Sequence, residues 1–388
     1  MNLKLSRRHE WVLQSEIRNM SIECDRIGGI NLSQGVCDME VPSCVREGAR
    51  EAMEAGLNTY TRYDGIPELR VAIAAKQRRF TGMDPDPERE IIVSAGATGA
   101  LYCACLALLN PGDEVILFEP YYGYHVSTLV ATEAVPVYVN LNPPDWTFRR
   151  EDLEKAVTGR TRGILINTPA NPSGKVFTRE ELLMLADFAS AHDLFVFTDE
   201  IYEHFIYDGW SHTAPATLPG MRERTVTISG LSKTFSITGW RIGYCIADER
   251  WSRAIGYFND LVYVCAPSPL QMGVARGLME LDAAYYANLS VEFTVKRDLI
   301  CNALARAGLR PHVPRGAYYV LADISSVPGQ GSKEKAMNLL GKTGVACVPG
   351  EAFFSGTDGE SLARFCFAKE TPVLEEACNR LLSFREGR

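Results

Sequence analysis

The middle of this chain alternates short apolar runs with stretches patterned as helices, and this alternation limits the folds that it can adopt. The candidate strands are residues 91–94, 115–118, 135–139, 163–166, 194–198, 225–229 and 242–247. Most of these runs are apolar without interruption, which is typical of strands covered on both faces. Helical patterns lie between several of them, including residues 99–109 and 179–192. The sequence therefore predicts an α/β fold with a mainly parallel sheet.

The last hundred residues have a different pattern. One face of a long helix is marked by Leu289, Phe293, Ile300 and Leu304, and Gly308 follows as a stop signal. Strands are expected at residues 317–322 and 364–368, which indicates a second, smaller domain. We predict a large domain over residues 46–284 and a small one over 285–388, with residues 1–45 packing against the small domain.

Composition argues against several classes of partner. Lys and Arg number 40 against 48 Asp and Glu, so the net charge is −8 and the global positive field typical of nucleic-acid binding is absent. The longest apolar run, residues 100–109, is far shorter than the roughly 20 residues that span a bilayer. The eleven cysteines show no paired or metal-binding spacing, and the first residues are charged rather than signal-like. We expect a cytoplasmic protein with reduced thiols, no membrane segment and no metal site.

Ligands of open α/β sheets bind beyond the carboxyl ends of the strands, so the residues that follow each run are the candidates for chemistry. Small residues at 95–98 precede a helix, which suits a phosphate but also a tight turn. Asn171 precedes a proline in a rigid loop, where its amide either starts a turn or binds a ring substituent. Asp199 ends an apolar strand, where it either caps the next segment or faces a cation.

Lys233 follows the sixth run and has mostly small or apolar neighbours. Most lysines are solvated surface groups, but a lysine in apolar surroundings has a lowered pKa and can form a Schiff base. Arg241 starts the next strand, where a fixed guanidinium suits a phosphate. With Asp199, Asn171 and the phenol of Tyr202, these residues form the set that pyridoxal phosphate requires: an amine, an anion, hydrogen-bonding groups and a phosphate site.

The sequence resembles the class I/II aminotransferases, which are aspartate aminotransferase-like members of the fold-type I pyridoxal-phosphate-dependent enzymes. SGLSKTFSITGWRIGY is similar to the lysine motif of that family, and NTPANPSGKV and FTDEIYEHF are similar to its other signatures, in the expected order. The likeness extends from INLSQGVCDMEVP to ARFCFA. It implies a large domain with a seven-stranded, mainly parallel sheet between helices, a smaller α+β domain, a pyridoxal 5′-phosphate cofactor and a homodimer.

The resemblance implies a role for each matching residue. Lys233 would form the Schiff base and move the substrate α-proton, and Asp199 would pair with the protonated ring nitrogen. Tyr202 and Asn171 would bind the phenolic oxygen of the cofactor, and Tyr122 would stack on its ring.

Other matching residues would hold the phosphate and the substrate. Those implied for the phosphate are Gly96, Ala97, Thr98, Ser232 and Arg241, with Tyr60 reaching it from the neighbouring subunit. Arg364 would bind the α-carboxylate in a pocket that Gly35 and Asn171 line. Many relatives carry a hydroxyl residue where this chain has Gly230, and Ser229 or Ser232 would have to replace it.

The implied activity is transfer of an amino group from an L-amino acid to a 2-oxo acid, by a ping-pong mechanism through a Lys233 aldimine. A lyase or synthase on the same scaffold, such as a C–S lyase or an aminocyclopropane-carboxylate-synthase-like enzyme, stays open as the alternative. A cofactor-sensing regulator is a third hypothesis, but such regulators carry a DNA-binding domain first, and here the motifs begin by Asn31. The apolar segment 261–267 is expected to line the pocket from the partner subunit, which favours aromatic or aliphatic substrates.

Overall fold

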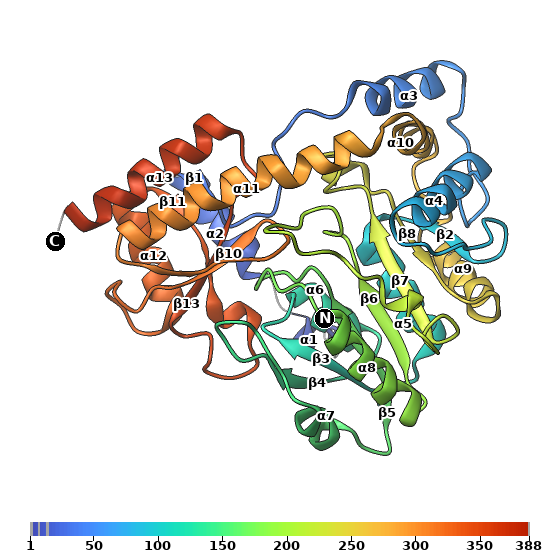
Figure 1. Ribbon diagram of the computed structural model, residues 1–388, viewed down its shortest axis with the longest axis horizontal. Coiled ribbons are helices and arrows are strands. Elements are labelled where there is room, and N and C mark those ends of the chain that lie inside the picture. The colour runs from blue at the N-terminus through green and yellow to red at the C-terminus, as the bar shows by residue number, and fades with distance from the viewer. Residues whose placement is uncertain (1–2, 7, 13–14, 387–388) are drawn as a thin grey trace.

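Seven strands form one sheet, in the order β2-β8-β7-β6-β5-β3-β4, in the computed structural model, which describes residues 3–6, 8–12 and 15–386 (Figure 1). Their bounds are β2 (Ile91–Ser94), β3 (Glu114–Glu119), β4 (Val135–Asn140), β5 (Thr161–Asn167), β6 (Phe195–Asp199), β7 (Thr225–Gly230) and β8 (Gly243–Ile246). All pairs are parallel except those of β8, which runs antiparallel to both β2 and β7. Every predicted strand overlaps an observed one, so the prediction of an α/β fold with a mainly parallel sheet is confirmed.

Helices cover both faces of this sheet, which explains its uninterrupted apolar strands. In β5, Ile164 and Ile166 pack on one face while Leu165 packs on the other. The Leu165 face is covered by α5 (Gly96–Leu108), α6 (Gly123–Ala131) and α9 (Glu249–Tyr263). The opposite face is covered by α4 (Pro67–Phe80), α8 (Arg179–Ala191) and α10 (Ser268–Glu280). The short α7 (Arg150–Ala156) contacts β4, and α3 (Ser43–Glu54) packs along α10.

A smaller unit contains a four-stranded sheet in the order β12-β13-β10-β9. Its strands are β9 (Arg310–His312), β10 (Tyr319–Asp323), β12 (Val348–Pro349) and β13 (Leu362–Cys366). Its helices are α11 (Ala283–Arg306), α12 (Gly331–Thr343) and α13 (Thr371–Glu386). The predicted face of α11 is buried in the core of this unit, and Gly308 follows the helix with a φ of 81°. A smaller α+β unit beside the large sheet is therefore confirmed.

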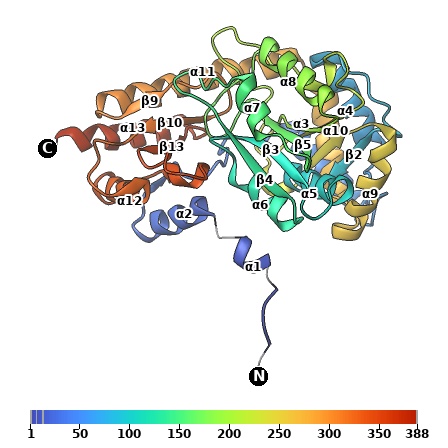
Figure 2. The same ribbon diagram turned by 90° about the horizontal axis from the view of Figure 1, so that it is seen from below.

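The N-terminal segment contacts both units. Strand β1 (Ile30–Asn31) pairs in parallel with β11 (Val345–Ala346), and α2 (Glu16–Arg26) packs beside them. The short α1 (Arg8–Trp11) lies against α6 instead, as Figure 2 shows. The boundaries at 45/46 and 284/285 stay a prediction, and they fall inside α3 and in the first turn of α11. Residues 1–2, 7, 13–14 and 387–388 of the predicted domains lie outside the described residues.

One helix begins earlier than the sequence predicts. We expected a loop over residues 95–98 and a helix from residue 99, but α5 begins at Gly96. Gly96 has a φ of 78°, a conformation that glycine adopts without strain, and it lets the chain turn directly from β2 into the helix. Gly96, Ala97 and Thr98 therefore form the first helical turn, where backbone N–H groups have no helical acceptors.

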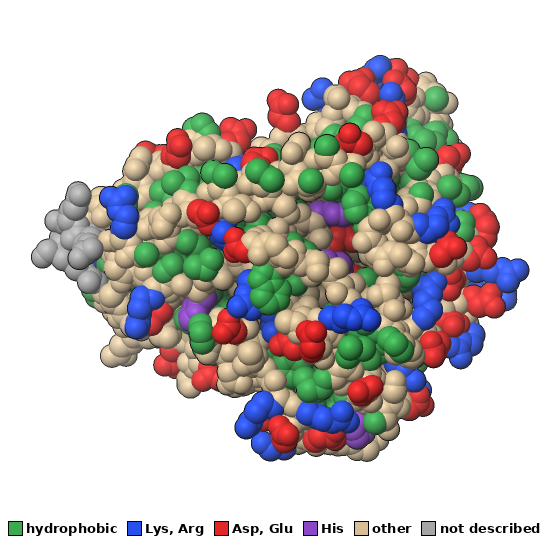
Figure 3. Space-filling view, viewed as in Figure 1, with side chains coloured by type: hydrophobic (Ala, Val, Ile, Leu, Met, Phe, Trp, Pro, Cys, Tyr) green, Lys and Arg blue, Asp and Glu red, His purple; other side chains and the backbone are tan. Residues whose placement is uncertain are grey.

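The surface carries both signs of charge. Figure 3 shows Lys and Arg side chains interspersed with Asp and Glu across the face in view, without a continuous basic stripe. Among the described residues, no helix combines the length and the hydropathy needed to cross a membrane.

Candidate active site

The antiparallel β8 explains how residues far apart in the sequence meet at one edge of the large sheet. The carboxyl ends of β2 and β7 lie at the same edge as the beginning of β8, because Ser94 and Gly230 both pair with Gly243. Arg241, just before β8, therefore lies between the turn after β2 and the loop after β7. The loops after β3, β5 and β6 start at this edge as well, because these strands run parallel to β7.

Lys233 is a half-buried lysine in the loop after β7, at this edge of the sheet. Its Nζ donates a hydrogen bond to the carbonyl oxygen of Gly35, 3.0 Å away, and lies 5.8 Å from the ring centre of Tyr318. Burial is the main cause that lowers the pKa of the Lys233 amine to about 8; the thiols of Cys366 and Cys37 oppose the shift, and the charges of Arg241 and Arg364 add to it. An amine with this pKa is substantially neutral at slightly alkaline pH, which makes it a nucleophile and a base.

Asp199, at the end of β6, is 9% exposed and is held on both carboxylate oxygens. Its Oδ2 lies 2.8 Å from Nε2 of His125, and its Oδ1 accepts a hydrogen bond from the backbone N–H of Ile201. His125 lies in the first turn of α6, and the sequence analysis missed it. The signal was present, because a histidine three residues after Tyr122 projects from the same turn of a helix.

Arg364 and Asn171 meet on the other side of the site. Arg364 is 1% exposed in β13, and its Nη1 donates a 2.8 Å hydrogen bond to Oδ1 of Asn171. Its Nη2 donates to the carbonyl of Ser33, while its buried Nε has no partner in the described part of the chain. The backbone N–H of Asn171 donates to Oδ1 of Asn167, which fixes the loop after β5. A buried guanidinium with an unused N–H is suited to bind a carboxylate.

Gly96 and Arg241 form a close contact at the phosphate side of the predicted site. A Cβ at position 96 would overlap the guanidinium of Arg241, and the φ of 78° at this position also favours glycine. Arg241 donates to the carbonyl oxygens of Thr238 and Ala95, and Thr98 is exposed at the first turn of α5. A helix N-terminus beside an arginine is a favourable anion site.

The two serines that could replace the hydroxyl missing at Gly230 differ in their environment. The hydroxyl of Ser229 points into the core and donates to Oε1 of Glu203 at 2.9 Å. Ser232 is buried in the loop that carries Lys233, next to the edge of the sheet. Ser232 is therefore the better placed of the two.

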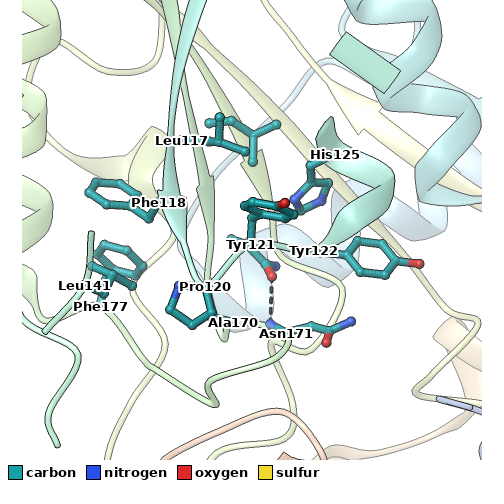
Figure 4. A pocket seen from close by; sticks show the side chains of 12 residues that line it. Leu117, Phe118, Pro120, Tyr121, Tyr122, His125, Leu141, Ala170, Asn171 and Phe177 are labelled. Atoms are coloured by element: carbon teal, nitrogen blue, oxygen red, sulfur yellow. Dashed lines mark hydrogen bonds between the residues drawn. The ribbon is translucent and has the colours of Figure 1, made fainter. Parts of the chain in front are cut away.

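Tyr122 and Asn171 both line the small pocket drawn in Figure 4, together with His125. Tyr122 directly precedes α6, and its ring packs edge-on against His125 at 5.2 Å. Tyr202 is 3% exposed, and its hydroxyl lies 2.9 Å from the hydroxyl of Tyr319. Tyr319 is a second residue that the sequence analysis missed, although a tyrosine in the apolar run 317–322 needs a hydrogen-bonding partner when it is buried.

A buried ion pair anchors the turn that carries Asp199 and Tyr202. Glu203 accepts hydrogen bonds from Nζ of Lys76 in α4 and from Ser229 in β7. Burial alone would raise the pKa of Glu203, but the charge of Lys76 lowers it to about 2. Removing one partner of such a buried pair typically costs about 3–5 kcal/mol of stability. Glu200 in the same turn is held by His212 at 2.6 Å. The turn that carries Asp199 and Tyr202 is therefore held by the contacts of its two glutamates with Lys76 and His212.

Tyr60 is a predicted site residue whose side chain is largely exposed to solvent in this chain. Its exposed fraction is 82%. The other predicted residues, from Gly35 to Arg364, come together at the sheet edge from the N-terminal segment, the large unit and the small unit. Among the described residues, no group of three or more His, Cys, Asp or Glu side chains could hold a metal ion.

The comparisons with known proteins agree with this geometry. The family model described as aminotransferase class I and II matches residues 27–381. The chain belongs to this family. Class I and II aminotransferases use pyridoxal phosphate, so this protein is a pyridoxal-phosphate-dependent transaminase, and transamination is favoured over the lyase alternative.

Named relatives cover nearly the whole chain. A kynurenine–oxoglutarate transaminase of Dictyostelium discoideum is 33% identical over 93% of this chain and 92% of its own length. Aromatic-amino-acid aminotransferase 2 of Thermococcus litoralis is 35% identical over 98% of this chain and 97% of its own. The structure of N-succinyldiaminopimelate aminotransferase from Mycobacterium tuberculosis superposes with a TM-score of 0.94 at 36% identity, covering 98% of this chain and 100% of that one. The fold is therefore that of the fold-type I aminotransferases.

Proposed function

We propose that the residues assembled at the sheet edge hold pyridoxal phosphate and catalyse transamination of an L-amino acid with a 2-oxo acid. The donor set fits the cofactor: Lys233 offers an amine to its aldehyde, and Asp199 offers an anion to its ring nitrogen. The first turn of α5 and Arg241 offer N–H groups to its phosphate, and the close approach at Gly96 leaves no side chain in the way. The observation that carries this proposal is that the half-buried amine of Lys233 and the buried Arg364, with its unused Nε, lie at one site.

In this proposal each residue has one task. When bound, pyridoxal phosphate supplies an aldehyde that takes up an amino group and a ring that withdraws electrons from the substrate α-carbon. Arg364 and Asn171 bind and orient the α-carboxylate. Asp199 keeps the ring nitrogen protonated, and Tyr202 donates a hydrogen bond to the phenolic oxygen. Tyr122 packs on the ring. Lys233 would act as a base that removes the α-proton and then as an acid that delivers a proton to the cofactor carbon bonded to the substrate nitrogen. General acid–base catalysis of this kind typically accelerates a proton transfer by about 10²–10⁴-fold.

A ping-pong course follows from this single set of groups, because the same Lys233 serves both half-reactions. The test is to mix the protein with L-amino acids and 2-oxoglutarate or pyruvate. A transaminase consumes one oxo acid for each amino acid and forms a new amino acid. Release of ammonia and pyruvate from the amino acid, without consumption of the added oxo acid, would establish the lyase instead.

We further propose that the physiological donor is an amino acid with an aromatic or aliphatic side chain. Tyr122, Tyr202, Tyr318 and Tyr319 surround the groups that bind the carboxylate and the cofactor. Two of the relatives described above carry names for kynurenine and aromatic amino acids. A panel of donors at equal concentration tests this, and the proposal predicts that kcat/KM for phenylalanine, tyrosine and methionine exceeds that for aspartate. A preference for aspartate or glutamate would contradict it.

The protein is proposed to act as a homodimer in which Tyr60 reaches the neighbouring active site. The Ser268 hydroxyl donates to the carbonyl of Thr59, which places Tyr60 beside the end of segment 261–267. Leu261 and Val262 in that segment are 78% and 47% exposed, and such apolar exposure favours a protein interface. We expect sedimentation at twice the 43.0 kDa chain mass, and dissociation in Leu261→Asp. Sedimentation of the unaltered protein as a monomer would refute the dimer.

We place this activity in cytoplasmic amino-acid metabolism, including biosynthetic transamination. All eleven cysteines are free thiols, and most are buried, as suits a reducing compartment. Fractionation of cells that express the tagged chain tests the location.

The Lys233 amine gives a prediction for the pH dependence of cofactor capture. Only the neutral amine attacks an aldehyde, and burial lowers the pKa of Lys233 to about 8. The amine is therefore mostly protonated at pH 7 and mostly neutral at pH 9. We expect the rate at which the cofactor-free protein captures pyridoxal phosphate to rise about tenfold over this range and then level off. Stopped-flow absorbance measures it, and a rate that still climbs steeply above pH 9 would indicate an ordinary solvated lysine.

A further inference from the structure

Tyr319 touches two residues of the proposed site, and the function proposed above gives it no role. It occupies the first position of β10 and is 2% exposed. Its hydroxyl lies 2.9 Å from that of Tyr202. Its ring lies under the guanidinium of Arg364, with Cζ 4.3 Å from the ring centre. One side chain therefore contacts both the phenol proposed to bind the cofactor and the cation proposed to bind the substrate.

The strand register and a glycine fix the place of this side chain. Tyr319 pairs with Cys366 and Leu321 pairs with Arg364, so Tyr319 and Arg364 are diagonal neighbours on one face of the small sheet. Gly35 provides room for the hydroxyl, because a Cβ at that position would overlap it. The Tyr319 hydroxyl is thus held against Tyr202 from two sides, by the small sheet and by the N-terminal segment.

The electrostatic environment favours Tyr319 as the donor in this pair. Burial raises the pKa of Tyr202 well above its ordinary value. Burial also raises the pKa of Tyr319, to about 12, with Arg364 opposing the shift. A cation against its ring makes the Tyr319 hydroxyl the readier donor, and a phenol can accept one hydrogen bond while it donates another.

We propose that Tyr319 is a positioning residue that donates its hydrogen bond to Tyr202 and so directs the Tyr202 proton to the phenolic oxygen of the cofactor. This inference rests on the proposed function, because that oxygen belongs to pyridoxal phosphate. Without Tyr319, the Tyr202 oxygen no longer accepts a hydrogen bond, and the direction of the Tyr202 O–H bond is no longer fixed. Hydrogen bonds in a buried chain also polarise one another, so the bond to the cofactor becomes stronger.

The test is a pH titration of the visible absorbance of the bound cofactor. A hydrogen bond from Tyr202 draws negative charge from the phenolic oxygen, and a less negative oxygen holds a proton on the Lys233 nitrogen less tightly. Tyr319→Phe weakens this bond, so we expect the titration midpoint to rise by about 0.5–1 unit. Tyr202→Phe removes the bond and raises the midpoint further. The kcat should fall several-fold in Tyr319→Phe with little change in KM, because the ring under Arg364 remains.

Two comparisons separate positioning from a structural role. Tyr207→Phe removes another buried hydroxyl from the same core, one bonded to the carbonyl of Ala317, and it should lower the melting temperature without moving the midpoint. In the Tyr202→Phe background, Tyr319→Phe should shift the midpoint no further, because it acts through Tyr202. An unmoved midpoint in Tyr319→Phe, or a full shift in the Tyr202→Phe background, would overturn the inference.

Failure of this inference differs from failure of the proposed function. If the protein does not bind pyridoxal phosphate, the unaltered chain develops no visible absorbance and shows no titration. If Tyr319 has no positioning role, the unaltered chain titrates normally and Tyr319→Phe titrates at the same pH.

Discussion

Lys233→Ala is expected to abolish the visible absorbance of the bound cofactor and to lower turnover by about 10⁴-fold or more. The substitution removes both the amine that captures the aldehyde and the base that moves the α-proton. Among the described residues, no other lysine donates to the Gly35 carbonyl, so no second amine occupies this position. Absorbance spectra and steady-state rates of the purified variant, with saturating pyridoxal phosphate, measure the two effects separately.

A buried lysine elsewhere in the chain provides the control. Lys296 in α11 is 3% exposed and is paired with Glu292 at 2.7 Å, so Lys296→Met removes a lysine amine away from the site. That variant should lose stability but keep the cofactor absorbance. Near-normal turnover in Lys233→Ala, with Lys296→Met behaving as expected, would exclude the role of Lys233.

Asp199→Asn is expected to retain bound cofactor but to lose about 10³-fold in rate. At 4 Å and an effective dielectric constant near 20, a charge pair is worth about 4 kcal/mol, or roughly three pKa units on the ring nitrogen. Asparagine preserves the size of the side chain and can still bond to His125, so the loss isolates the negative charge. Single-turnover kinetics with excess amino acid measure the rate of the chemical step.

The control for this prediction is a carboxylate away from the site. Asp187 is exposed on α8, and Asp187→Asn should leave the rate unchanged. If Asp199→Asn proceeds at the rate of the unaltered protein, the electron-withdrawing role of the ring nitrogen does not depend on this residue.

The large sheet could be predicted from sequence because most of its strands are continuous apolar runs with polar residues at one end. An uninterrupted apolar run indicates a buried strand, and the residues directly after β5, β6 and β7 could therefore be chosen as site candidates. The start of α5 was mispredicted because the run 95–98 contains a glycine and other small residues, a composition that also suits a tight turn. The positive φ of Gly96 is a property of the folded backbone that composition does not reveal.

The hydrogen-bond partners of His125 and Tyr319 could not be assigned from sequence because these contacts are tertiary. The neighbour of His125 is Asp199, 74 positions away, and that of Tyr319 is Tyr202, 117 positions away. Neither spacing has a local signature. The role of Tyr60 stays a prediction for a similar reason, since its expected contact belongs to another copy of the chain.

The N-terminal segment contributes to this site through its backbone. The carbonyl oxygens of Ser33 and Gly35 accept hydrogen bonds from Arg364 and Lys233, while the side chain at Gln34 is exposed. Scanning mutagenesis that trims side chains leaves such oxygens where they are, so this stretch would look dispensable at the exposed Gln34, although the buried Ser33 hydroxyl donates to Asn31. A one-residue deletion or insertion changes which oxygen faces which cation. Engineering of this enzyme can therefore vary the side chain at Gln34, but has to keep the number of residues between Ser33 and Gly35.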